Sequence, residues 1–261
     1  MACSPSSTPS KPPQFQWVKT FELDSLSPIG MAVYQHQLWL SDGDNNRLVA
    51  LDSAGHITQI ITNFERPMHL DANEQGLYVP EYGKDTISIV QATGKQGILE
   101  IGLPLDAPAG VSLQGSKVAL ADFYNHRVVY TTNQQQWKSL GSKGKGQGQF
   151  HYPTDVQWTP QELFVADAYN HRVQVFDHQG QYLRTIAEKD SLNAATGFHV
   201  SDTLLAVTDF EQNRVLIYST AGKRLQIIAG GLDKPTDVLF WKGNLYVLNY
   251  GSGALQCYSL Q

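Results

Sequence analysis

Three side chains with metal-binding chemistry stand at one position of a repeated segment. His69, Asp155 and Asp237 each lie two residues after a proline, in "RPMHL", "YPTDV" and "KPTDV". Imidazole nitrogen and carboxylate oxygen are ligands of divalent cations such as Zn²⁺ and Ca²⁺. Because the three residues are far apart in the sequence, they can share a site only if the fold brings equivalent positions of its repeats together.

The repeated segment occurs six times. A phrase such as "DAYNHRVQVF" opens with an acidic residue, or with its amide in the last copy, at intervals of 39 to 45 residues. These six residues, here called the motif ring, are Asp42, Glu81, Asp122, Asp167, Asp209 and Asn249. A proline keeps step with them at positions 28, 67, 108, 153 and 235, and Ala195 replaces it in the fifth copy. Periods of this length are typical of solenoids, propellers and arrays.

The apolar pattern of each repeat predicts four short strands. In the fourth copy they are "TDVQW", "ELFVADA", "HRVQVFD" and "QYLRTIA". The second strand is almost continuously apolar, so both of its faces must be covered, whereas the outer two strands alternate. No segment keeps a helical period. Inner strands packed on both sides and half-exposed outer strands are typical of a propeller blade between two neighbours.

The two ends of the chain predict how the ring closes. The sixth copy ends at "LQCYSLQ", after its third strand, and residues 15–23, "FQWVKTFEL", form a strand that belongs to no copy. This strand is expected to become the outer strand of the last blade, which leaves no open sheet edge at the seam. The sequence therefore predicts an all-β, six-bladed propeller of four-stranded antiparallel blades over residues 15–261.

The recurring phrases resemble a known family. "YNHRVQVFD" and "YNHRVVY", each after a strand that ends in Ala-Asp, are similar to NHL repeats, and "GSKGKGQGQFHYPTDV" resembles the glycine-rich approach of that family to its next blade. The resemblance covers residues 28–261. It implies a propeller that serves as an interaction platform, an RNA binder or a metal-dependent lyase, without selecting among them. We expect the repeated Asp, Asn and Arg, with His126 and His171, to be structural.

The residues two positions after the proline are expected near the axis, at the mouth of the central channel. This channel ring consists of Gly30, His69, Gly110, Asp155, Gly197 and Asp237. Its polar members come from alternate blades. Two interpretations are open: His69, Asp155 and Asp237 hold a divalent cation (Ca²⁺ or Zn²⁺), or they hydrogen-bond to nearby backbone.

Aromatic residues recur next to the motif ring. The position after it holds Tyr82, Phe123, Phe210 and Tyr250 in four copies, and Tyr124 and Tyr169 stand nearby. The four are expected to rim the same channel mouth. They either form a binding surface for a peptide, sugar or protein, or pack between blades.

Composition and the N-terminal segment limit the function classes. A net charge of −5 and a pI of about 5.9 argue against a nucleic-acid surface. No run of 18 apolar residues is present. Residues 1–14 are rich in Ser and Pro and are expected to be a disordered tail or tether. Cys3 begins a stretch that resembles a mature bacterial lipoprotein; the alternatives are a lipid anchor facing the periplasm or a plain tail.

The preferred hypothesis is a monomeric, non-enzymatic binding or scaffold propeller. It would recognise a protein, peptide or small ligand at the channel-mouth face, and would contact a membrane only through a lipid on Cys3. The predicted binding residues are His69, Asp155, Asp237, Tyr82, Phe123, Phe210 and Tyr250. The alternative is a metal-dependent lyase or hydrolase with its cation at His69, Asp155 and Asp237.

Overall fold

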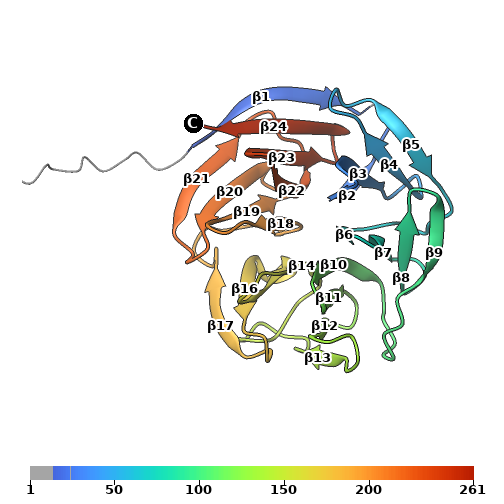
Figure 1. The fold of residues 1–261 in the computed structure, drawn as a ribbon. Coiled ribbons are helices and arrows are strands. Elements are labelled where there is room, and N and C mark those ends of the chain that lie inside the picture. Colours follow the sequence, from blue (N-terminus) through green and yellow to red (C-terminus); the bar gives the residue numbers. More distant parts are fainter. Residues whose placement is uncertain (1–13, 24) are drawn as a thin grey trace, which may run out of the picture.

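Six antiparallel sheets surround a central axis (Figure 1). The computed structural model describes residues 14–23 and 25–261, and in this part of the chain each sheet has four strands. The six-bladed propeller expected from the sequence is confirmed. One short 3₁₀ turn, η1 (Ala168–Asn170), connects β15 to β16. No helix in the described part of the chain is long and apolar enough to cross a membrane.

Each blade is built from the axis outward in chain order. The first three blades are β2 (Pro28–Tyr34), β3 (Gln37–Asp42), β4 (Arg47–Leu51) and β5 (Ile57–Ile61); β6 (Asp71–Asn73), β7 (Gly76–Glu81), β8 (Thr86–Gln91) and β9 (Gly94–Ile98); β10 (Pro108–Gln114), β11 (Lys117–Asp122), β12 (Arg127–Thr131) and β13 (Lys138–Leu140). The last three are β14 (Pro153–Trp158), β15 (Leu163–Asp167), β16 (Arg172–Phe176) and β17 (Tyr182–Ile186); β18 (Phe198–Val200), β19 (Leu204–Asp209), β20 (Arg214–Ser219) and β21 (Arg224–Ala229); β22 (Pro235–Trp241), β23 (Asn244–Asn249), β24 (Ala254–Leu260) and β1 (Phe15–Glu22).

The N-terminal strand closes the ring, as the sequence predicts. β1 pairs antiparallel with β24, from Phe15 opposite Leu260 to Glu22 opposite Ala254. The side chain of Phe15 is buried with residues of blades 5 and 6. The last sheet is therefore made from both ends of the described chain (Figure 1). Residues 1–13, including Cys3, lie outside the described residues.

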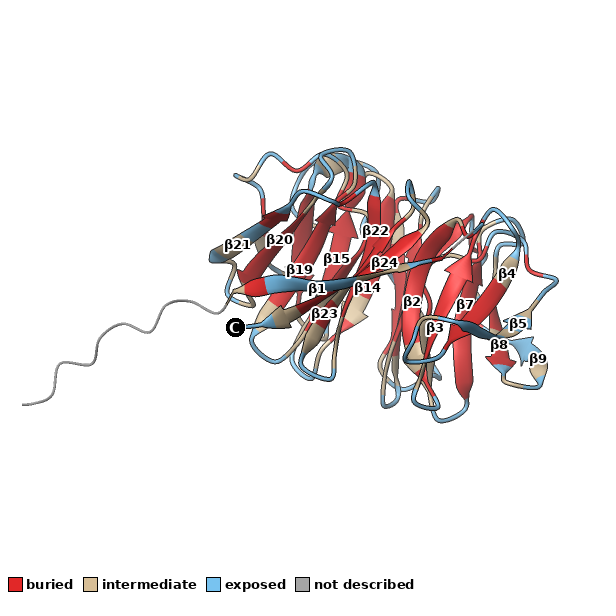
Figure 2. Cartoon of the chain, turned by 90° about the horizontal axis from the view of Figure 1, so that it is seen from above, coloured by how far each residue is buried: buried red, intermediate tan, exposed pale blue. Residues whose placement is uncertain are grey.

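The apolar core is divided among the blade interfaces. Six clusters of buried side chains each join two neighbouring blades. The second strands supply the most deeply buried residues, such as Leu40, Leu120 and Leu163. Figure 2 shows these inner strands buried and the outer strands and connections exposed. The continuous apolar runs in the second strands are explained by this burial, which contributes about 1.5–3 kcal/mol for each large side chain.

The propeller has two unlike faces. The turns between the first and second strands, such as β14–β15, and those between the third and fourth strands lie on one face, here called the turn face. The connections between the second and third strands, and those from each outer strand to the next blade, lie on the opposite face, the loop face. The connections into β14 and β18 span residues 141–152 and 187–197 and are the long ones. Every first strand therefore runs from the loop face to the turn face.

Candidate functional site

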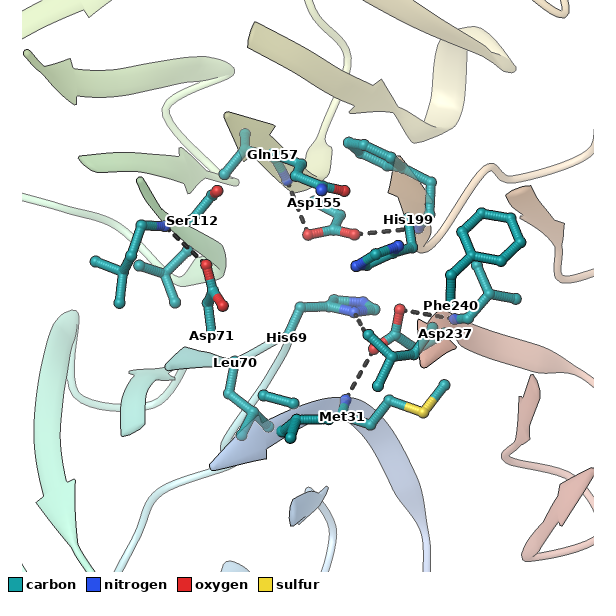
Figure 3. Close-up of a pocket in the computed structure, with 18 of the residues that line it drawn as sticks. Met31, His69, Leu70, Asp71, Ser112, Asp155, Gln157, His199, Asp237 and Phe240 are labelled. Atoms are coloured by element: carbon teal, nitrogen blue, oxygen red, sulfur yellow. Dashed lines mark hydrogen bonds and ion pairs between the residues drawn. The ribbon is translucent and has the colours of Figure 1, made fainter. Parts of the chain in front are cut away.

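The channel ring brings its three polar residues together. Each of His69, Asp155 and Asp237 offers a ligand atom, and these atoms all lie within 4.8 Å of one another. All three residues are buried, at 5 to 7% exposed. Figure 3 shows the three side chains converging from separate blades on the centre of the channel. The sequence spacing located this cluster, while its binding role stays a prediction.

The glycines of the channel ring allow this convergence. A Cβ on Gly30 would lie 2.6 Å from the Cα of His69, and one on Gly110 would lie 2.9 Å from the Cα of Asp155. A Cβ on Gly197 would lie 2.3 Å from the carbonyl oxygen of Thr236. No side chain fits at these positions because the strands of neighbouring blades touch there. The channel is therefore narrow at the level of this ring.

Both aspartates of the channel ring also hold blades together. Asp155 accepts the backbone N–H of Val156 at 2.8 Å and that of Phe198, in the next blade, at 3.1 Å. Asp237 accepts the N–H of Val238 and of Met31, across the seam, at 2.8 Å each. The two aspartates therefore make the hydrogen bonds to nearby backbone that the second interpretation expects. These bonds do not exclude a ligand, since each carboxylate oxygen can accept a second hydrogen bond.

His69 lacks such a partner. Its Nδ1 is buried, lies 3.8 Å from Oδ2 of Asp237, and makes no hydrogen bond to a described residue. Burial alone would lower the pKa of His69, but the carboxylates of Asp155 and Asp237 raise it above its ordinary value. Burial raises the pKa of Asp155 to about 7, opposed by His69 and reinforced by the negative charge of Asp237. A positive charge added beside these residues would therefore lower the pKa of Asp155 and of His69.

A cavity of about 330 Å³ extends from the channel ring. Its wall is formed by successive residues of the first strands and of the segment that leads into β6, beginning at His69, Asp155 and Asp237 and ending at Trp158 and Trp241. Since those strands run toward the turn face, the cavity does too. Residues at its inner end are buried, whereas Phe240 and Trp241 are half-exposed. The cavity therefore opens on the turn face.

Several cavity residues were not identified from the sequence. They are Asp71, Ser112, Gln157, Trp158, Phe240 and Trp241. Asp71 and Gln157 lie two residues beyond the channel ring, as His199 does, so the two-residue period of a strand was the signal that could have found them. Burial raises the pKa of Asp71 to about 6 and lowers the pKa of His199 to about 4.

The predicted aromatic residues do not line this cavity. Tyr82 and Phe123 lie on the loop face with their ring centroids 5.8 Å apart. Phe210 and Tyr250 form a separate pair at 6.4 Å. The expectation of one shared mouth for these residues and the polar cluster differs from the structure, because the cavity runs from the channel ring toward the opposite face.

Tyr82 and Phe123 belong to a larger group on blades 2 to 4. This aromatic cluster consists of Tyr82, Phe123, Tyr124, His126, His151, Tyr152 and Tyr169. Tyr152 lies at its centre, with its ring 4.7 Å from that of Phe123 and 5.2 Å from that of Tyr169. His151 and Tyr152 were missed because they stand before the proline, outside the recurring phrase. Tyr124 is 48% exposed and Tyr169 is 54% exposed.

The motif ring is structural, as expected. The arginine five residues after each aspartate donates to it: Arg47 to Asp42, Arg127 to Asp122, Arg172 to Asp167 and Arg214 to Asp209, at 2.6 to 2.8 Å. Asp167 also accepts the backbone N–H of His151, at 2.7 Å. These carboxylates are fully buried. A buried charge needs such a set of partners.

The residue before each motif arginine links one blade to the next. His126 has φ 52° and accepts the backbone N–H of Tyr152 through Nδ1, at 3.1 Å. Asn46 and Asn213 have φ 56° and 52° and accept equivalent N–H groups through their side-chain oxygens. Asn and His tolerate this left-handed backbone. The recurrence of Asn and His in the motif is therefore explained by blade linkage, and not by ligand binding.

Comparisons with known proteins agree with the fold. No family model matches the chain. The E3 ubiquitin-protein ligase TRIM32 from Mus musculus is 28% identical over 144 residues, and TRIM32 from Homo sapiens is 28% identical over 141 residues. Each match covers 47% of this chain and 21% of the length of the relative. The chain therefore corresponds to a small part of these ligases.

Solved structures match over nearly the whole chain. A gluconolactonase from Xanthomonas campestris has a TM-score of 0.78 and 15% identity, covering 97% of this chain and 96% of its own. A streptogramin B lyase has a TM-score of 0.67 and 13% identity, covering 98% and 100%. The nidogen/laminin complex has a TM-score of 0.67 and 18% identity, covering 82% and 85%. At these identities the likeness shows the propeller fold alone.

Proposed function

We propose that this chain is an NHL-type propeller that binds a protein or peptide through the aromatic cluster on its loop face, without catalysing a reaction. The observation that carries this proposal is the contact of seven aromatic and histidine rings across blades 2 to 4, with Tyr124 and Tyr169 about half exposed. Tyrosine-rich patches on rigid scaffolds are enriched at protein interfaces and supply much of their binding energy.

The shape of the cluster supports a protein or peptide as the partner. The rings come from connections between the second and third strands and from the connection into β14, so a fixed frame supports them. Tyr82 also stacks under Arg66, whose guanidinium carbon lies 5.6 Å from its ring centre. The curated relatives are ubiquitin ligases that carry NHL repeats, and one structural neighbour is a protein–protein complex. Similarity to these proteins supports a partner-binding role for this chain.

A peptide selected on the protein tests the proposal. Peptides from a displayed random library are selected on the full chain, and their affinity is measured by fluorescence anisotropy. The double variant Tyr124→Ala, Tyr169→Ala should bind the selected peptide at least about tenfold more weakly, because exposed tyrosines at an interface contribute about 1–2 kcal/mol each. The matched control is Trp17→Ala, which removes a 61% exposed aromatic from β1 on the outer rim. Equal affinity of the double variant and the wild type would contradict the proposal.

A metal-dependent lyase or hydrolase is the second candidate. The donor set of His69, Asp155 and Asp237, within 4.8 Å and with the Nδ1 of His69 unpartnered among the described residues, fits a divalent cation. A bound cation would polarise an oxygen of a substrate in the cavity. The aspartates would keep their backbone hydrogen bonds, which fix their orientation.

Metal analysis distinguishes this candidate. Stoichiometric Ca²⁺ or Zn²⁺ in purified protein, lost in the variant Asp155→Ala, Asp237→Ala but kept in Asp202→Ala, would support it. Asp202 is the control because it is an exposed aspartate on the turn face. Protein that stays metal-free after incubation with either ion would remove this candidate and leave the binding platform.

We further propose that Cys3 carries a lipid that anchors the chain in a bacterial envelope. The support is the Ser-rich stretch after this cysteine. Metabolic labelling with a fatty acid should mark the full chain and not the Cys3→Ser variant; equal labelling of both would remove the proposal. The expected monomer stays a prediction, which light scattering on purified protein can check.

A further inference from the structure

We propose that the channel cavity binds a small organic cation, a protonated amine carried on a flat apolar stem, which enters from the turn face with its charged end inward. This site is independent of the loop-face interface proposed above. The cavity lies on the other side of the channel ring, and no residue of the aromatic cluster lines it. The two proposals can therefore fail or succeed separately.

The charge of the cavity wall selects for a cation. Three carboxylates, those of Asp71, Asp155 and Asp237, line it, and none of its described lining residues is a lysine or arginine. Two ammonium groups lie only at its open end, where Lys117 is over the ring of Trp158 and Lys242 over that of Trp241. His199 stays neutral at ordinary pH because burial lowers its pKa. Three carboxylates face a single imidazole whose pKa is raised, that of His69, so acidic groups outnumber basic ones in the lining. A narrow cavity with an excess of one sign of charge concentrates ligands of the opposite sign. An anionic ligand would have no counter-charge except the imidazole of His69.

The carboxylates are held in place before any ligand binds. Asp71 accepts the backbone N–H of Ala72 and of Leu113, in the next blade, at 2.7 Å each. It repeats, two residues further along the channel, the link that Asp155 makes to Phe198. Each oxygen can still accept a hydrogen bond from an ammonium group. Because the strands fix the carboxylates, binding costs little side-chain ordering.

Two histidine nitrogen atoms without a hydrogen bond lie in the same cavity as these carboxylates. The Nδ1 atoms of His69 and His199 are buried without a hydrogen-bond partner among the described residues. Seven buried side-chain atoms of the described residues lack a hydrogen-bond partner, and three of them, including Nε1 of Trp158, belong to residues that line this cavity. Such atoms are available to pair with a bound group. The neutral imidazole of His199 can accept a hydrogen bond from an ammonium group, which has three donors to share between this histidine and the carboxylates.

The open end of the cavity suits the apolar part of the ligand. Trp158, Phe240 and Trp241 stand there, next to the aliphatic side chains of Val33 and Leu113. Figure 3 shows the acidic residues around the channel centre and Phe240 beside them. These apolar walls suit the stem of the ligand, since the rings of Trp158 and Trp241 already have the ammonium groups of Lys117 and Lys242 over them. The volume of about 330 Å³ holds a small organic molecule and far exceeds that of a single ion.

Binding of 2-phenylethylamine to the full chain, measured by isothermal titration calorimetry, tests the proposal. We expect saturable one-to-one binding, and at least about tenfold weaker binding of 2-phenylethanol, which keeps the stem but lacks the charge. This comparison uses only the wild-type protein, so it does not depend on whether a variant folds. Absence of amine binding at millimolar concentration, or equal binding of the alcohol, would overturn the proposal.

Variants locate the site. Asp71→Asn removes one wall charge, and we expect at least about tenfold loss of amine affinity with little change for the alcohol. Trp241→Ala, at the half-exposed rim, should weaken both ligands. The matched controls are Asp202→Asn, an exposed aspartate of the turn face, and the loop-face variant Tyr124→Ala, Tyr169→Ala; neither should change binding. Unchanged amine affinity in Asp71→Asn and Trp241→Ala would place the ligand elsewhere and overturn the proposal.

A metal arm distinguishes the two kinds of cation. The titration is repeated after addition of CaCl₂ or ZnCl₂. Stoichiometric, tight binding of either metal that abolishes amine binding would assign the cavity to the metal and overturn the organic-cation proposal. Amine binding that persists with metal present supports it.

Discussion

Two rings of side chains, the motif ring and the channel ring, occupy equivalent places in all six blades but have different partners. In four blades the motif ring pairs a buried aspartate with an arginine at 2.6 to 2.8 Å. The channel ring alternates glycines with three polar residues, and Nδ1 of His69, 3.8 Å from Oδ2 of Asp237, makes no hydrogen bond among the described residues. Residues that repeat and are fully hydrogen-bonded stabilise the fold, while departures from the repeat mark where the molecule can bind something.

Removal of β1 should have the largest effect, because it opens the ring that carries both sets of residues. Deletion of residues 1–23 leaves β24 unpaired and removes Phe15 and Leu23 from two apolar clusters. We expect aggregated protein, or loss of cooperative thermal unfolding, since an exposed inner strand pairs with other chains. Gel filtration and circular dichroism measure both outcomes.

Deletion of residues 1–13 is the matched control, since it keeps β1. It should melt like the full chain. A soluble, cooperatively unfolding monomer from the longer deletion would contradict the role of β1 as a closing strand.

Loss of a motif-ring carboxylate comes next in size. Asp167 is fully buried and bonds to Arg172, Asn170, Gln174 and the backbone of His151. Asp167→Ala leaves the guanidinium of a 7% exposed arginine without its counter-charge, which typically costs about 3–5 kcal/mol. Denaturant unfolding should show this loss, whereas Asp202→Ala should stay within about 0.5 kcal/mol of wild type. Equal stability of the two variants would contradict a structural motif ring.

The sequence predicts the motif ring well because each copy repeats the same local chemistry. An aspartate, a turn residue and an arginine at fixed spacing lie in one blade, so the pattern contains both partners. It fails in blade 2, where Thr86 replaces the arginine. There Lys95 of the outer strand β9 bonds to Glu81 at 2.6 Å, a pairing that no short-range pattern reveals. A basic residue that replaces the motif arginine from another strand can be identified only from the folded structure.

The channel was only partly predictable. The spacing identified His69, Asp155 and Asp237, because equivalent residues of a closed ring must converge. It did not show that the cavity extends toward the turn face, since that depends on how far the first strands approach one another beyond the glycines. Tyr82, Phe123, Phe210 and Tyr250 were assigned to the mouth of this cavity because the sequence did not show on which face the cavity opens. Sequence position gives the blade and the strand end, but not which end of the channel stays open.

Removal of a single blade link should have a moderate effect. His126→Ala loses the hydrogen bond to the N–H of Tyr152 and places alanine at φ 52°. We expect a loss of about 1–2 kcal/mol by denaturant unfolding. His126→Asn keeps an acceptor and tolerates this backbone, so it should recover most of the loss. Failure of asparagine to recover more stability than alanine would argue against the link.

The smallest change in stability is expected in the channel, at His199, and it should depend on pH. Burial lowers the pKa of His199 to about 4, whereas an unfolded histidine has a pKa of about 6.5. Between these values the unfolded chain binds a proton that the folded chain does not, so this residue makes the protein less stable as the pH falls. His199→Phe removes the titrating group and the unpartnered Nδ1. At pH 8 the variant should unfold within about 0.5 kcal/mol of wild type.

At pH 5 the same variant should be the more stable of the two in denaturant unfolding. Asp71, Asp155 and His69 share the cavity with His199 and have shifted pKa values in both proteins, so the difference between variant and wild type isolates His199. A histidine that had a hydrogen-bond partner, as His126 has in the motif, would lose stability on substitution at every pH. A His199→Phe variant that is less stable than wild type at both pH 5 and pH 8 would show that the channel residues are as structural as the motif. A stability difference that favours the variant only below pH 6.5 would show that His199 is buried in its neutral form and does not stabilise the fold.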